Sequence, residues 1–102
     1  MTSKLVNGNT LVFKLTDKGE IGNIEFEGIV VNFVADLSDV NIDVIKSIKN
    51  NLIKFGQSIY NNKGSFVIVC DISFSDELNI VPTIQEAFDF IEMEEIERKL
   101  DF

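Results

Sequence analysis

Ile-Val-Val-Asn-Phe-Val-Ala-Asp-Leu, residues 29 to 37, is the longest apolar run of the chain and decides its fold. A second apolar run, from Ser65 to Cys70, is closed by Asp71 much as Asp36 closes the first. Short runs of β-branched residues are typical of strands that are covered on both faces, as in parallel sheets. Because a helical pattern separates the two runs, the sequence predicts a right-handed strand-helix-strand unit and a parallel sheet.

The segment between the two strands has the clearest amphipathic pattern of the chain. Residues 39 to 43 offer several possible N-caps for a helix. Apolar residues then recur at spacings of three and four, at Ile45, Ile48, Leu52, Phe55 and Ile59. Gly64 is expected to end this helix before the second buried strand begins.

A hairpin is predicted before the central strand. The segments from Lys4 to Val6 and from Thr10 to Leu15 flank a turn signal, Asn7-Gly8-Asn9, that pairs strands antiparallel. Apolar residues alternate along the second segment, which is expected of a hairpin at the edge of a sheet. The glycine-rich segment from Asp17 to Gly28 is either a loop or another short strand.

The C-terminal part predicts a short strand and a second helix. Asn79 to Val81 can form the strand, and Thr83 with Glu86 forms a capping box that opens the helix, which runs to about Lys99. Two apolar faces follow from a rotation of about 100° per residue. One contains Ile84, Ala87, Phe88 and Ile91 and is expected to pack on the sheet, and the other contains Phe90, Met93, Ile96 and Leu100.

The fold class is therefore α/β, a small and mostly parallel sheet with an antiparallel edge hairpin and helices packed on it. A length of 102 residues and 45% hydrophobic content predict a single domain, residues 1 to 102. The net charge of −8 predicts repulsion from nucleic acids and anionic membranes, and it favours a basic protein as partner. One cysteine and no run near the about 20 apolar residues of a membrane helix predict a cytoplasmic protein.

The order of these elements resembles the STAS domain of anti-sigma-factor antagonists and sulfate-transporter tails. The similarity covers about Thr10 to Met93, and its most specific pieces are Val34-Ala35-Asp36-Leu37-Ser38 and Val81-Pro82-Thr83-Ile84-Gln85-Glu86-Ala87. The ending from Ile91 to Leu100 is also similar to small acidic STAS-like proteins of Bacteroidetes-type bacteria that are encoded beside ribonuclease Z. The resemblance implies a regulatory, protein-binding domain of this fold.

Two departures from the STAS pattern bear on function. In the switch-type members, an Asp-Ser-Ser-Gly or Asp-Thr-Ser-Gly box is phosphorylated by a partner kinase, and the corresponding positions here are Asp43, Val44, Ile45 and Lys46. Because valine cannot accept a phosphate, the usual switch is predicted to be absent. Ser38 and Ser47 lie nearby as a relocated acceptor or as cap and turn formers. The family's first helix finds no support in the segment from Asp17 to Gly28.

Carboxylates at the ends of the two buried strands raise the question of a ligand site. Asp36 and Asp71, with Asp39 or Asp43, could hold Mg²⁺ or border a nucleotide or metabolite, because open α/β sheets bind ligands at this edge. The alternative is that they cap turns and helices. The chain has no histidine, no phosphate-binding glycine loop and no nucleophile elbow. We therefore expect no catalytic residues, metal or cofactor, and nucleotide or metabolite binding stays the alternative function.

The C-terminal helix supplies the candidate partner-binding site. Its second apolar face, Phe90, Met93, Ile96 and Leu100, would anchor a protein while Glu94 and Glu97 orient a basic partner. Residues 92 to 102 are expected to project as a helix end. Three explanations remain open for this face: a protein partner, a second copy of the chain, or a tail that ends or bends near Met93 and folds back on the domain.

Overall fold

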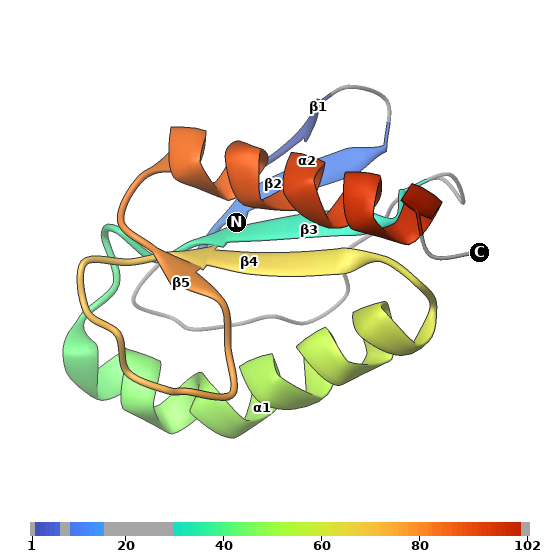
Figure 1. Cartoon of the computed structure of the whole chain (residues 1–102). Coiled ribbons are helices and arrows are strands. Elements are labelled where there is room, and N and C mark those ends of the chain that lie inside the picture. The colour runs from blue at the N-terminus through green and yellow to red at the C-terminus, as the bar shows by residue number, and fades with distance from the viewer. Residues whose placement is uncertain (1, 7–8, 16–29, 101–102) are drawn as a thin grey trace.

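The computed structural model (Figure 1) describes residues 2–6, 9–15 and 30–100, except for the side chains of residues 2–5. It is an α/β fold with one five-stranded sheet in the order β1-β2-β3-β4-β5. The strands are β1 (Thr2–Val6), β2 (Thr10–Lys14), β3 (Asn32–Asp36), β4 (Ser65–Val69) and β5 (Ile80–Val81). The helices α1 (Ile42–Asn61) and α2 (Ile84–Leu100) cover opposite faces of this sheet (Figure 1).

The predicted strand-helix-strand unit is confirmed. β3 and β4 are parallel, with Asn32 opposite Ser65 and Asp36 opposite Val69. β2 and β5 extend the parallel arrangement on either side, and β1 pairs antiparallel with β2 as the edge hairpin. The segment from Asp17 to Gly28, for which a loop or a strand was predicted, lies within residues 16–29, outside the described part.

The sheet is buried on both faces, which explains the two continuous apolar runs. On the α1 face, the Phe55 ring makes edge-to-face contacts with Phe13, Phe33 and Phe66, at centroid distances of 5.2 to 6.1 Å. On the α2 face, the buried residues are Val34, Val67, Val69, Ala87 and Ile91. Alternate residues of β3 and β4 therefore enter different cores.

The ends of α1 follow local chemistry, with one difference from the prediction. Asn41 is the N-cap, and its Oδ1 accepts the backbone N–H of Asp43 at 2.8 Å. At the other end the positive φ of 64° falls on Lys63, not on Gly64. Gly64 is needed for close approach, because a Cβ there would lie 1.7 Å from the carbonyl oxygen of Val31.

α2 begins at its predicted cap and continues to Leu100, close to its predicted end at about Lys99. The Glu86 backbone N–H donates to Thr83 Oγ1 at 3.2 Å, which is half of a capping box. Ile84, which was expected to pack on the sheet, is 36% exposed, because it lies in the first turn of α2, just after the short strand β5. The helix does not end near Met93 but continues to Leu100, so that form of the fold-back explanation is wrong. Neither α1 nor α2 is long and apolar enough to cross a membrane.

Candidate functional site

The outer face of α2 carries three exposed apolar side chains, which we call the apolar ridge. Met93 is 63% exposed, Ile96 is 50% exposed and Leu100 is 78% exposed. Their spacing of three and four residues places them along one side of the helix, away from the buried Ala87 and Ile91. An apolar stripe on a regular helix with nothing packed on it is typical of an interaction surface.

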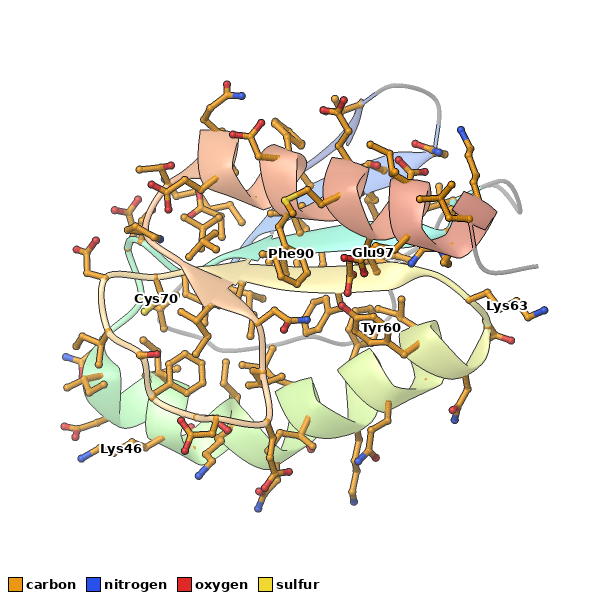
Figure 2. All side chains as sticks on the ribbon, viewed as in Figure 1. Lys46, Tyr60, Lys63, Cys70, Phe90 and Glu97 are labelled. Carbon is orange, nitrogen blue, oxygen red and sulfur yellow. The ribbon has the colours of Figure 1, made fainter. Side chains whose placement is uncertain are left out.

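Phe90 does not belong to the apolar ridge, which corrects the prediction. Its side chain is half-buried and packs against the core on the α2 face of the sheet. Figure 2 shows Phe90 directed from α2 toward β4 and β5. Phe90 lies at the border between the two faces of α2, where an aromatic ring can reach the sheet; the ridge therefore begins at Met93.

Glu94 joins α2 to α1 through a tyrosine. The Tyr60 hydroxyl donates to Glu94 Oε1 at 2.8 Å, and it accepts from Asn79 Nδ2 at 2.7 Å. One hydroxyl therefore connects α1, α2 and the residue before β5. Burial, followed by the hydrogen bond and negative charge of Glu94, raises the pKa of Tyr60 above its ordinary value, because both disfavour the phenolate.

Glu95 holds the inner side of α2 against the start of two strands. Its Oε2 accepts from Asn9 Nδ2 at 3.2 Å and from Asn32 Nδ2 at 3.4 Å. Asn32 is fully buried, and its Oδ1 accepts the backbone N–H of Ser65 at 3.0 Å. One turn further on, Arg98 donates to Ser65 Oγ at 3.0 Å. These contacts link α2 to the amino ends of β2, β3 and β4, and we call them the polar clamp.

The glutamate run is thus divided between two roles. Glu94 and Glu95 are half-buried and hydrogen-bonded within the domain, whereas Glu92 and Glu97 are exposed and their side chains have no hydrogen-bond partner in the described structure. The predicted partner-binding Glu94 therefore also has a contact inside the domain. With Tyr60 and Lys63, Glu97 lines a hollow of about 320 Å³. Figure 2 shows Glu97 on α2 close to Tyr60 on α1.

The positions of the degenerate phosphorylation box lie in the first turns of α1. Val44 is half-buried, Ile45 is buried in the core and Lys46 is exposed. Figure 2 shows Lys46 directed away from the sheet. Ser47 donates its hydroxyl to the Val44 carbonyl at 2.7 Å, which is a local helical contact.

The carboxylates at the strand ends, Asp36 and Asp71, do not form a ligand site together in the described structure. Asp36 Oδ1 accepts the backbone N–H of Ser38 at 2.9 Å, which forms a turn after β3, and Asp71 is exposed. The described residues contain no group of three or more acidic, cysteine or histidine side chains that could hold a metal ion. Cys70, which ends the second apolar run, is a buried free cysteine (Figure 2).

Neither Asp36 nor Asp71 lines any of four hollows formed by the described residues. The largest of these four, about 400 Å³, lies between the second half of α1 and residues 77–79. It is therefore at the amino end of β4, opposite the edge at which a nucleotide or metabolite was considered. All its polar lining groups are neutral except Glu77.

Comparison with known proteins gives no family for this chain: no family model matches it, and no curated protein matches it. Sequence reasoning located the apolar ridge but missed the polar clamp, whose members Asn9, Asn32, Ser65 and Glu95 are far apart in the chain. A buried asparagine in the central strand was the one available signal, because asparagine interrupts an otherwise apolar run there.

Proposed function

We propose that this chain is a non-catalytic, STAS-like protein-interaction domain that binds a protein partner through the outer face of α2. The observation that carries the proposal is the exposed apolar ridge of Met93, Ile96 and Leu100. Support for the STAS type comes from the order of the sequence motifs. The parallel sheet with a helix on each face is compatible with it.

The ridge is a fixed feature of the helix surface. Rotating α2 to bury Ile96 would pull Glu94 from Tyr60 and Glu95 from Asn32. Because the polar clamp and the Tyr60 contact hold the opposite side, the ridge stays outward, where another molecule can pack on it. Phosphorylation of the usual box is not part of this proposal, since Val44 occupies the acceptor position.

The test is affinity capture from native extract with wild type, Ile96→Asp and Ile72→Asp, followed by identification of the retained proteins. Ile72 is the matched control, because it is also 50% exposed but lies in the segment after β4 rather than on α2. Both changes add the same negative charge. We expect one protein to be retained by wild type and Ile72→Asp and lost by Ile96→Asp. The purified pair should then show a Kd raised by about tenfold or more in Ile96→Asp.

Equal capture by all three proteins would overturn the proposal. A dimer that sedimentation detects in wild type and not in Ile96→Asp would replace the partner with a second copy of the chain. An Ile96→Asp variant several kcal/mol less stable than Ile72→Asp would show that the ridge is internal, which is the remaining form of the fold-back explanation.

A further inference from the structure

A second feature of α2 lies beside the apolar ridge, on the side that faces β2. It is a hollow of about 200 Å³ lined by Asn9, Thr10, Phe88, Ile91, Glu92 and Glu95. This volume is below the about 300 to 1,000 Å³ usual for small-molecule sites, but it has room for one long side chain. Glu92 lies one turn before Ile96, so the hollow and the ridge form one continuous surface.

The charge of this hollow distinguishes it from the one on the other side of α2. Among the described residues, its lining contains two carboxylates and no basic side chain. The hollow on the α1 side contains Lys63 and Arg98 as well as two glutamates, so its charges balance. Lys99, which follows Glu95 by one turn, does not line the β2-side hollow and makes no salt bridge with either glutamate. The β2-side hollow therefore favours a cation.

Both carboxylates have oxygens that are available to a cation. Glu95 is held in place by Asn9 and Asn32 through Oε2, which leaves Oε1 without a partner in the described structure. The Glu92 carboxylate is exposed and also unpartnered. The half-buried ring of Phe88 and the buried Ile91 supply apolar walls for an aliphatic stem. A guanidinium group can bond two carboxylate oxygens and stack on an aromatic face, which an ammonium does less well.

We infer that this hollow receives an arginine side chain of the partner, next to the apolar residues that cover the ridge. The inference rests on the proposed function and names the chemistry of the partner: an apolar seam flanked by an arginine. A second copy of the chain does not meet this description well, because it would bring an acidic α2 face against an acidic hollow. The net charge of −8 points the same way.

The test uses N-acetyl-arginine amide as the probe, titrated into ¹⁵N-labelled protein and followed by amide chemical shifts. The citrulline analogue is the neutral control of the same shape, and the lysine analogue tests the need for a planar group. We expect saturable shifts at Asn9, Thr10, Phe88, Glu92 and Glu95 with arginine, smaller ones with lysine and none with citrulline. Glu92→Gln should weaken arginine binding about two- to fivefold, since the pair is partly exposed. Glu86→Gln, the same change on an exposed residue of α2 outside the hollow, should leave it unchanged.

Several results would overturn the inference. Equal shifts with citrulline, shifts spread over other acidic residues such as Asp76, or equal weakening by Glu92→Gln and Glu86→Gln would each show that no arginine site exists. The result is independent of the capture experiment. Arginine binding together with unchanged capture by Ile96→Asp would keep the hollow and remove the proposed interface. An Ile96-dependent partner whose affinity is unaffected by Glu92→Gln would keep the interface and remove the arginine.

Discussion

Asn32, the buried side chain between Glu95 and Ser65 in the polar clamp, is expected to contribute strongly to the stability of the fold. Asn32→Asp keeps the shape and the acceptor oxygen, so the bond from the Ser65 N–H at 3.0 Å can persist. The change replaces the amide that donates to Glu95 at 3.4 Å and to Thr10 at 3.5 Å. In the variant, the carboxylate at position 32 faces the Glu95 carboxylate, whereas in wild type the Asn32 amide donates to Glu95.

The expected loss follows from the burial of that position. Two long hydrogen bonds contribute at the lower end of about 0.5 to 1.5 kcal/mol each, and an unpaired carboxylate at a site with no exposure costs more. We expect the free energy of unfolding to fall by about 2 to 4 kcal/mol near neutral pH. Asn32→Ala should lose about 2 to 3 kcal/mol, because it leaves the buried N–H of Ser65 without its acceptor.

The loss in Asn32→Asp should depend on pH, and the loss in Asn32→Ala should not. Burial and the Glu95 carboxylate raise the pKa of the introduced carboxyl in the folded state above its unfolded value of about 3.9. Such a group is least destabilising when protonated, so the deficit grows as pH rises from the unfolded toward the folded pKa. Urea unfolding followed by circular dichroism between about pH 4 and 7 should show the deficit increasing by at most about 1.4 kcal/mol per pH unit.

A compensating variant gives the strongest check. In Asn32→Asp with Glu95→Gln, the amide and the carboxylate exchange places, so that a donor again faces an acceptor and Asn9 can still donate to the amide oxygen. We expect more than half of the lost free energy to return, measured as a double-mutant cycle. Deficits that are equal at both ends of the pH range, with no recovery in the double variant, would refute the contact between Asn32 and Glu95 as the support of α2.

Two further predictions concern the residues around the end of α1. Gly64→Ala should lower the free energy of unfolding by about 3 kcal/mol or more in the same urea assay, since the added Cβ would lie 1.7 Å from the Val31 carbonyl oxygen. Lys63→Gly should raise the free energy of unfolding by about 0.5 to 1 kcal/mol, because glycine adopts the positive φ of this position without strain. A change of the same sign in both variants would contradict this division of roles. Tyr60, the only tyrosine, should ionise at higher pH in the folded chain than in urea, because folding raises its pKa. The stability that this shift contributes is complete below about pH 10 and is lost as pH rises through the folded pKa. If phenolate absorbance rises at the same pH in Glu94→Gln as in wild type, Glu94 is excluded as a cause of the shift.

Local patterns predicted most of the fold because each pattern reports on burial. The runs that became β3 and β4 are apolar because both faces of those strands are covered, and the three- and four-residue spacing of α1 matches its buried stripe of Ile45, Ile48, Leu52 and Ile59. The N-cap of α2 could be predicted for a different reason, since the Thr83 hydroxyl accepts from a backbone N–H only three residues away. These features depend on neighbours in the sequence.

The candidate site was predictable only in part, because it depends on contacts between distant residues. The sequence shows that α2 has two apolar faces, but Phe90 could not be assigned to either without the position of the sheet. Glu94 and Glu97 look alike in the sequence, yet Glu94 accepts a hydrogen bond from Tyr60 and Glu97 has no side-chain partner among the described residues. The hydrogen bond from Asn9 to Glu95 spans a separation of 86 residues, and no local spacing can indicate it.

The polar clamp also has a consequence for binding. Docking on a loose helix end costs the free energy of ordering each immobilised segment and side chain, about 0.5 to 1.5 kcal/mol per flexible side chain. α2 is held by Tyr60 near its middle and by Arg98 near its end, so Met93, Ile96 and Leu100 project from a helix that is already ordered. Glu95 extends the same argument to charge, since it is oriented before a cation arrives. If these polar contacts serve to preorganise the surface, Asn32→Ala should weaken partner binding even though Asn32 is buried and cannot touch the partner. A partner that binds wild type and a still-folded Asn32→Ala variant equally would show that the clamp supports only the fold.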